Sequence, residues 1–461
     1  MWLLSLIVIP IVAGLGMLTR RMETPWESKA FGAVIAAYTF VVAIATNGQE
    51  FSVRWLSRPF TANFHFGMTS ISFWLVLLLA LCTFCAILAS NVPRANSFIG
   101  QILVLLGTMM GLFLAKDLLV FALFWDLMLL PVFFTLLGWG RHHGTAWRYF
   151  IYNFAGGLTL LLATAAFGVL NGTTDVIGST NVHLIGAWVP WIFAGFAFAF
   201  LVKTPVWPLH TWMPLTYADT PSPMVAVVSA VQSKAGLYGF IVIGMALMPD
   251  YVKAFALPLV VLGVISLLYG AFAALTQSDA KRVVAYSSLS HLGLIIVAIA
   301  SFNPIALQGA VVYMVAHGLF SAALFLILGY IEEREETRTI ARLGGLGAQN
   351  PRLAGALTIA MLAALGLPGL AGFVGEIVIL TGVVQAGWIW AALLALIPIV
   401  LAAAYMLRLF QGIMHGPEVP DLPVRADLSW LEGVALAPLV IALVYVGVDP
   451  HALTAIQGII R

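Results

Sequence analysis

The chain is built almost entirely from apolar runs long enough to cross a lipid bilayer. A membrane-spanning helix needs about 20 mainly apolar residues. Fourteen runs approach or exceed this length, and they cover residues 2–18, 30–46, 67–91, 98–115, 117–138, 146–170, 185–204, 222–247, 252–277, 280–301, 305–330, 353–383, 387–411 and 428–447. Because the runs are continuous and do not alternate with polar residues, they exclude a transmembrane β-barrel. The sequence therefore predicts an all-α polytopic membrane protein of about 14 transmembrane helices.

Composition agrees with this fold class. Of 461 residues, 62% are hydrophobic and 9% are charged, whereas an ordinary soluble domain has about 25% charged residues. This small number of charged residues cannot cover a water-facing surface. Lipid must therefore cover most of the protein, and we expect no soluble domain. The first run is short and follows no basic stretch, which favours a first helix over a cleaved signal peptide.

The distribution of basic residues predicts the orientation. If the N-terminus lies outside, fourteen Lys and Arg fall in cytoplasmic loops and five on the outer side. Cytoplasmic loops carry the excess of positive charge in membrane proteins. Both termini are therefore predicted on the outer side of the membrane.

Cofactor-binding motifs are absent from the sequence. Cys82 and Cys85 form a C-x-x-C inside the third run, but an iron–sulfur cluster takes four ligands, and the two thiols are better explained as small buried hydrophobes. There is no P-loop and no G-x-G-x-x-G after a strand. We expect no cofactor or metal in this chain and no nucleic-acid partner.

Two runs contain helix breakers. The first break includes Pro205 and Pro208 in K-T-P-V-W-P-L-H, and the second is G-L-P-G-L-A-G over 366–372. Broken helices inside a membrane are tolerated where protein or a water-filled cavity satisfies the freed backbone groups. The breaks fall in the seventh and twelfth runs, so an odd offset of five helices gives them opposite orientations. Such inverted repeats are typical of transport sites, although a packing kink is the alternative for either break alone.

Ionisable residues lie deep inside several runs. Asp126 is about nine residues into its run, or about 13 Å from the end at 1.5 Å per residue, and Lys234 is about twelve residues into its own run. A charge at such a depth costs at least a few kcal/mol unless it is paired or neutralised. Lys203, just before the first break, could mark a helix end or act as the partner of Asp126. The alternative for Asp126 is a carboxylic acid that hydrogen-bonds a neighbouring helix.

Two histidines and a second acid continue the series. His291 and His317 are central in consecutive runs, and Glu376 directly follows the second break. A single buried histidine is usually a structural residue, but two on consecutive spans favour a proton relay, because histidine titrates near neutral pH. Glu376 could instead be a carboxyl group neutralised beside the unwound backbone.

These residues predict proton transfer along the middle of the bilayer. The series is Asp126, Lys203, Lys234, His291, His317 and Glu376, with Asp219 and His210 as secondary candidates. In coupled titrations, each group changes its protonation as the charge of its neighbour changes. The sequence shows no source of energy for this transfer, so a larger complex is expected to supply it.

At these residues the chain resembles a known family. The stretches F-A-L-F-W-D-L-M-L-L-P, A-F-L-V-K-T-P-V-W-P-L-H-T-W-M-P, K-A-G-L-Y-G, S-D-A-K-R-V-V-A-Y-S-S-L-S-H-L-G, Q-G-A-V-V-Y-M-V-A-H-G-L and G-L-P-G-L-A-G-F-V-G-E resemble the antiporter-like subunits of proton-pumping NADH–quinone oxidoreductase, respiratory complex I. The likeness is closest to the chain M or subunit 4 type, and it covers roughly residues 67–411.

The resemblance implies an architecture. The implied fold has fourteen helices, which include two inverted five-helix repeats at helices 4–8 and 9–13. Each repeat contains a broken helix. The expected divisions are 1–66 (helices 1 and 2 and a loop), 67–250 (helices 3–8), 251–411 (helices 9–13) and 412–461 (a loop and the C-terminal helix). It also implies a bacterial inner membrane, and a complex with other membrane subunits that include homologous antiporter-like subunits.

The resemblance also implies residue roles. Asp126 and Lys203 become an acid–lysine pair, Lys234 a central relay lysine, His291 and His317 connecting residues, and Glu376 the terminal proton site. Redox chemistry belongs to other subunits, so this chain is expected to carry no catalytic residue of its own.

Two departures from the family pattern leave alternatives open. The family usually has glutamate where this chain has Asp126, and P-D-A-H-x-x-A-P-T where this chain reads P-L-T-Y-A-D-T-P-S-P. An Mrp-type multi-subunit cation/proton antiporter or a membrane-bound hydrogenase complex is therefore an alternative parent assembly.

Overall fold

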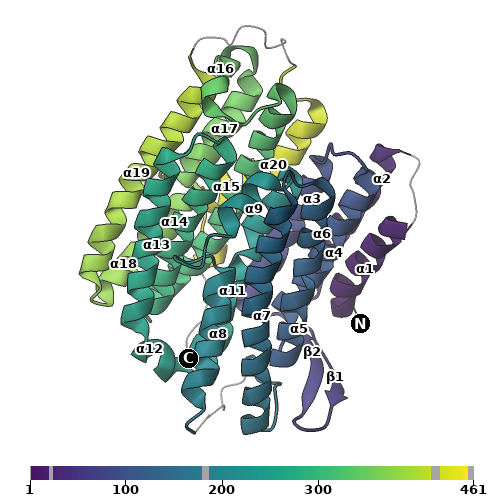
Figure 1. Ribbon diagram of the computed structural model, residues 1–461, viewed down its shortest axis with the longest axis vertical. Helices are drawn as coiled ribbons and strands as arrows, with labels where there is room; N and C mark the ends of the chain where they lie inside the picture. Colours follow the sequence, from purple (N-terminus) through teal and green to yellow (C-terminus); the bar gives the residue numbers. More distant parts are fainter. Residues whose placement is uncertain (1, 20–23, 179–185, 417–425, 455–461) are drawn as a thin grey trace. The chain divides into compact units, whose positions relative to one another are not determined.

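The computed structural model describes residues 2–19, 24–178, 186–416 and 426–454. In these ranges, twelve helices are long and apolar enough to cross a membrane. Three shorter apolar helices, α8 (Val189–Lys203), α17 (Pro351–Ala364) and α18 (Ala371–Gln385), account for the seventh and twelfth predicted runs. Each of the fourteen predicted runs therefore corresponds to at least one helix, and the predicted all-α membrane fold is confirmed (Figure 1).

The chain divides into two compact units, which we call unit 1 and unit 2. Among the described residues, unit 1 contains 2–205 and 231–257, and unit 2 contains 206–230 and 258–454. The chain thus leaves unit 1 at the first break, at Pro205, and returns at Val231, three residues before Lys234.

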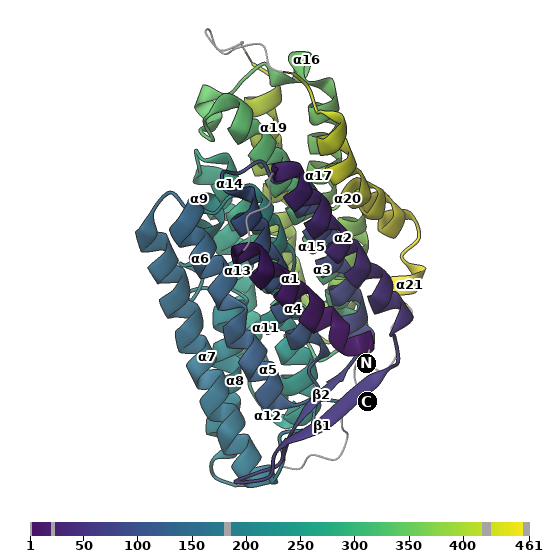
Figure 2. The same cartoon turned by 90° about the vertical axis from the view of Figure 1, so that its right-hand side faces the viewer.

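Unit 1 is a helical bundle with one hairpin. Besides α8, its elements are α1 (Trp2–Thr19), α2 (Pro25–Ala45), β1 (Glu50–Leu56), β2 (Ala62–Gly67), α3 (Ser70–Leu88), α4 (Ala95–Leu114), α5 (Leu118–Leu127), α6 (Leu129–Trp139), α7 (His143–Asn171), α11 (Lys234–Gly239), the π-helix η2 (Phe240–Met245) and α12 (Pro249–Ala254). Helices α7 and α8 lie side by side (Figures 1 and 2). Cys82 and Cys85 are buried free thiols in α3.

Unit 2 surrounds one long buried helix. Its elements are α9 (Met213–Asp219), α10 (Ser222–Val227), α13 (Ala256–Thr276), α14 (Ala280–Ala300), α15 (Pro304–Glu335), the 3₁₀ turn η3 (Ile340–Arg342), α16 (Leu346–Gln349), α17, α18, α19 (Ile389–Met414), α20 (Trp430–Val448) and α21 (His451–Thr454). Helix α15 packs against α10, α14, α17, α18 and α20. Its position therefore fixes which side chains of these helices meet.

Local chemistry defines several helix ends. Asp117, Asp279 and Asn303 cap α5, α14 and α15, because each side chain accepts hydrogen bonds from the first free backbone N–H groups. Helix α20 begins with a capping box of Ser429 and Glu432.

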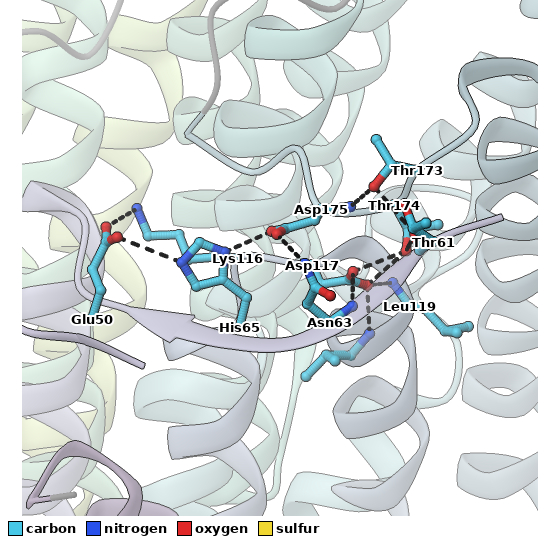
Figure 3. A network of polar contacts seen from close by, with 11 residues as sticks. Glu50, Thr61, Asn63, His65, Lys116, Asp117, Leu119, Thr173, Thr174 and Asp175 are labelled. Atoms are coloured by element: carbon cyan, nitrogen blue, oxygen red, sulfur yellow. Dashed lines mark hydrogen bonds and ion pairs between the residues drawn. The ribbon is translucent and has the colours of Figure 1, made fainter. Parts of the chain in front are cut away.

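A polar network attaches the β1–β2 hairpin to the helix ends of unit 1 (Figure 3). His65 lies between Asp175, 2.6 Å from its Nδ1, and Glu50, 3.5 Å from its Nε2. The fully buried Asp117 accepts from the backbone N–H of Asn63 and the hydroxyl of Thr174. The cap of α5 therefore also fixes the hairpin beside the helix that carries Asp126.

The predicted breaks are present, and two further irregularities were not predicted. Helix α8 ends at Lys203, and Gly366 and Gly369 have positive φ angles of 68° and 91° in the loop between α17 and α18. The run 117–138 is interrupted at Met128 between α5 and α6, where Pro131 has no N–H for the carbonyl one turn earlier. The run 222–247, predicted as one helix, contains the π-helical segments η1 (Val228–Gln232) and η2.

Candidate functional site

Lys203 in unit 1 is held by neutral partners. It is the last residue of α8 and is 1% exposed. Its Nζ donates to Oδ1 of Asn153 at 3.3 Å and lies 5.2 Å from the centroid of the Trp125 ring. A buried ammonium gains from both an amide acceptor and an aromatic face. These contacts hold the lysine head between helices α5, α7 and α8.

Asp126 lies within electrostatic range of Lys203, on the helix that also carries Trp125. Among the described residues, no ion pair joins Asp126 to Lys203, and the buried Oδ1 of Asp126 has no hydrogen-bond partner. The two groups predicted to form a pair are therefore neighbours that interact through space without a direct bond.

The carboxyl group of Asp126 packs against a glycine and beside a cavity. A Cβ atom added to Gly157 of α7 would lie 1.8 Å from Oδ1 of Asp126. A cavity of about 360 Å³ that opens to the surface also borders Asp126, and its lining is Trp55, Leu119, Ala122, Leu123, Asp126, Leu127, Leu130, Phe150, Phe154 and Leu161. Asp126 is the only charged residue of this lining, so an apolar space adjoins a single ionisable group.

Lys234 is fully buried, with 0% exposure. It begins α11 directly after the π-helix η1, and its Nζ lies 3.3 Å from the Ser233 hydroxyl and within electrostatic range of Cys82. π-Helical turns are frequent at functional sites because they change which residues face inward. If Gly236, two residues after Lys234, carried a Cβ atom, that atom would lie 2.2 Å from Oγ1 of Thr204. Helix α11 therefore passes close to the end of α8 that carries Lys203.

The two histidines of unit 2 are in contact. His291 of α14 and His317 of α15 have ring centroids 5.6 Å apart, with an interplanar angle of 77°. Phe320 packs on both rings, at 5.2 and 5.1 Å. His317 is fully buried and His291 nearly so. The predicted pair is therefore brought together inside apolar surroundings.

Glu376 of α18 is connected to this histidine pair through a residue that sequence reasoning missed. The hydroxyl of Tyr313 donates to Oε1 of Glu376 at 2.6 Å, and the Tyr313 ring lies edge-on to His291 with centroids 5.8 Å apart. The second carboxyl oxygen, Oε2, lies 2.2 Å from where a Cβ on Gly366 would be. The second break thus places a glycine backbone against the carboxyl group.

The secondary candidates lie in different surroundings. His210 packs edge-on against Tyr269, with ring centroids 5.0 Å apart. Asp219 lies 4.0 Å from the guanidinium of Arg338, which also pairs with Asp279 at 2.9 Å. Asp279 caps α14 and Arg338 follows the end of α15, so Asp219 belongs to a charged cluster at helix ends.

Sequence signals existed for the two missed residues. Tyr313 precedes His317 by four residues, which puts both on one face of a helix. Asn153 is the only amide residue inside the run 146–170. The partners that they contact depend on how the helices pack, which a single sequence does not reveal.

The geometry of each unit suits proton transfer and offers little to a metal. Among the described residues there is no group of three or more His, Cys, Asp or Glu that could hold a metal ion. Each unit instead combines one carboxyl group, half-buried in unit 1 and buried in unit 2, with two lysines or two histidines, side chains that can bind or release a proton.

Comparisons with known proteins assign the chain to a family of membrane proteins. Residues 115–402 match the family model described as NADH:quinone oxidoreductase/Mrp antiporter, transmembrane. NAD(P)H-quinone oxidoreductase chain 4 1 of Synechococcus sp. (strain JA-3-3Ab) is 32% identical over 98% of this chain and 90% of its own. NADH-quinone oxidoreductase subunit M of Rickettsia prowazekii is 33% identical over 89% and 85%.

Solved structures give the same result. A chain of respiratory complex I from Thermus thermophilus superposes with a TM-score of 0.89 and 30% identity, over 98% of both chains. A chain of the Mrp complex from Dietzia sp. shares the fold, with a TM-score of 0.88 and 20% identity over 99% of this chain and 97% of its own. The chain is therefore a member of the NADH:quinone oxidoreductase/Mrp antiporter family of membrane proteins.

Proposed function

We propose that this chain is a proton-translocating membrane subunit of a redox-driven complex of the NADH–quinone oxidoreductase type. Relatives that it matches along most of their length are named as subunit M or chain 4 of such oxidoreductases, at 30–34% identity. In this proposal it is a non-redox subunit without a cofactor, and electron transfer takes place in partner subunits.

The observation that carries the proposal is the burial of ionisable side chains within membrane-spanning helices. Lys203, Lys234 and His317 are at most 1% exposed, and each lies on an apolar helix or span. Ionisable residues inside a membrane are costly and characteristically mark ion pathways and proton relays. A purely structural membrane protein gains nothing from them.

The residues act as a series of sites whose charges influence one another. In unit 1, a proton moves between Asp126, Lys203 and Lys234, and each transfer changes the field at the next group. In unit 2, it moves among His291, His317 and Glu376, from which it is released. The conformational work of the parent complex changes the order in which these groups bind and release protons.

The proposal includes the surroundings of the chain. Its place is the bacterial inner membrane with both termini on the outer side, in contact with lipid and with other membrane subunits, homologous antiporter-like subunits included. The two broken helices belong to inverted repeats at helices 4–8 and 9–13. Unit 1 and unit 2 each contain part of both predicted central divisions, 67–250 and 251–411, because 206–230 belongs to unit 2 and 251–257 to unit 1.

An Mrp-type cation/proton antiporter is the second candidate. The family model covers both kinds of protein, and the fold of the Dietzia sp. Mrp chain matches closely. The higher identity to full-length oxidoreductase subunits favours the first candidate. Purification of the chain with its partners separates the two, because only an oxidoreductase contains iron–sulfur subunits.

The central test replaces Lys234 in the assembled complex. Lys234→Ala removes the relay, and Lys234→Arg keeps a charge that a protein cannot deprotonate. Both variants are expected to lose nearly all proton pumping, measured as pH-dye quenching in membrane vesicles, with assembly checked in the same membranes. Pumping by Lys234→Arg at the wild-type rate would make Lys234 a fixed charge and remove it from the relay.

A further inference from the structure

We infer that Tyr313 is a proton-relay residue between His291 and Glu376. The phenol hydroxyl would join the lysine, histidine and carboxyl groups of the proposed proton pathway. The inference rests on the proposed function, because it assigns a step within the proposed proton pathway. It concerns unit 2 alone, and its three residues come from α14, α15 and α18.

The first observation is the hydrogen bond. The 2.6 Å separation between the Tyr313 hydroxyl and Oε1 of Glu376 is at the short end of the range for an O–H donor and a carboxyl oxygen. Tyr313 is 0% exposed and Glu376 is 8% exposed, so bulk water does not compete for this bond. A general acid must lie within about 2.6–3.2 Å of the atom that it protonates.

The second observation is that packing fixes both ends of this bond. A Cβ on Gly375 would lie 2.8 Å from Cα of Tyr313, so the absence of a side chain lets α18 approach the backbone of α15. Gly366 leaves the room that Oε2 of Glu376 occupies. The carboxyl group is therefore confined between the phenol and the unwound backbone of the second break.

The third observation is the position of the histidines. The imidazole of His291 stands edge-on to the phenol ring, at an interplanar angle of 83°, and His317 lies next to His291 and one helical turn from Tyr313. Of the groups named in the pathway, the phenol is therefore the one that touches both the histidine pair and the acid.

The step conserves protons and involves no electron transfer. The O–H bond of Tyr313 breaks as a new O–H bond forms on Oε1 of Glu376. In the same event the phenolic oxygen takes a proton from the protonated imidazole of His291, which becomes neutral. After Glu376 has released its proton, the hydroxyl of Tyr313 again donates to the carboxylate, and the site is reset.

Tyr313→Phe tests this role, because it removes only the hydroxyl. The intact complex in membrane vesicles is compared with Glu376→Gln and with Tyr330→Phe, a control that removes a buried hydroxyl from the same helix. Positioned proton donors typically contribute about 10²–10⁴-fold to a rate. We expect Tyr313→Phe to reduce pumping at least about tenfold and Tyr330→Phe to leave it near the wild-type rate.

Infrared difference spectroscopy supplies a readout that a structural defect alone would not produce. The carboxyl C=O band that disappears in Glu376→Gln belongs to Glu376, and it should move to a higher wavenumber in Tyr313→Phe, because the hydrogen bond is lost. If Tyr313→Phe fails to assemble, replacement of Tyr313 by 3,5-difluorotyrosine keeps shape and hydroxyl while making the phenol more acidic. A changed pumping rate is then expected.

The outcomes separate the two proposals. If Glu376→Gln pumps poorly while Tyr313→Phe pumps at the wild-type rate, or leaves the band unmoved, Tyr313 is no relay and the proposed function stands. The same holds if difluorotyrosine leaves the rate unchanged. If Glu376→Gln itself pumps at the wild-type rate, the assigned role of Glu376 fails, and the role of Tyr313 fails with it.

Discussion

Asp126 in unit 1 is a half-buried carboxyl group and Glu376 in unit 2 a buried one, and their partners differ in kind. Asp126 faces a lysine at a distance, and that lysine is held by Asn153 and Trp125. Glu376 receives a direct hydrogen bond from the neutral hydroxyl of Tyr313. Both carboxyl groups pack against a glycine, Gly157 in one unit and Gly366 in the other.

The difference shows two ways to keep an acid usable inside a membrane. A nearby cation stabilises the carboxylate through space and responds strongly when either partner changes its charge. A hydroxyl donor stabilises it through one short bond and depends on exact placement. Pumping should therefore depend most on the charge of Asp126 in unit 1 and most on the exact position of the Glu376 carboxyl group in unit 2.

The largest expected effect comes from removing the charge in unit 1. Asp126→Asn has nearly the same shape as aspartate but cannot ionise, so Lys203 loses the group that responds to its protonation. We expect proton pumping to fall at least about a hundredfold, within the range for proton-transfer groups, while the complex still assembles. Dye quenching in vesicles and the amount of assembled complex measure the two quantities. Wild-type pumping would show that Asp126 is structural.

Much of this comparison could be predicted from the sequence, because it depends on depth and on backbone chemistry. The position of Glu376 within an apolar run predicted its burial, whereas Asp126 is only half-buried. Pro205, Pro208 and the glycines of 366–372 predicted the breaks. Proline and glycine act through local backbone geometry, which needs no tertiary structure.

The partners could not be predicted, because they depend on how helices rotate and cross. The Tyr313–Glu376 bond requires α15 and α18 to approach through Gly375, and the Lys203–Asn153 bond requires α7 beside α8. The π-helical segments around Lys234 were also missed, because one extra residue in a turn leaves no signal in hydrophobic periodicity.

The next prediction concerns the glycine behind Asp126. Gly157→Ala places a Cβ at 1.8 Å from Oδ1 in the present position, so the carboxyl group must move into the adjoining cavity and away from its current position relative to Lys203. Pumping should fall about tenfold, the equivalent of about 1.4 kcal/mol in a barrier. Gly156→Ala is a matched control, because its Cβ would meet Val202 at an ordinary 3.4 Å. Equal effects of the two variants would mean that helix packing, not the carboxyl position, is responsible.

A smaller effect is expected from the amide that holds Lys203. Asn153→Ala removes the acceptor at 3.3 Å but leaves the Trp125 ring and Asp126 in place. Loss of a hydrogen bond to a charged group costs about 1.5–3 kcal/mol, and the two remaining partners should limit the change in pumping to about threefold, or about 0.7 kcal/mol. A loss as large as that of Asp126→Asn would make Asn153, and not Asp126, the main partner of the lysine.

The smallest effect is expected from a change in the length of the acidic side chain. Pumping should respond less to this change at Asp126 in unit 1 than at Glu376 in unit 2. Asp126→Glu adds one methylene group beside a cavity of about 360 Å³, so the longer side chain has room and pumping should stay within about twofold of wild type. Glu376→Asp shortens the side chain by one methylene group, about 1.5 Å, and the hydrogen bond to Tyr313 cannot stretch that far from 2.6 Å. Pumping should then be partial, well below that of Asp126→Glu.

Initial rates of dye quenching for both variants, in the same membranes and normalised to assembled complex, measure this difference. If both variants pump equally well, the tyrosine bond does not confine Glu376, and the two carboxyl groups work in the same way after all.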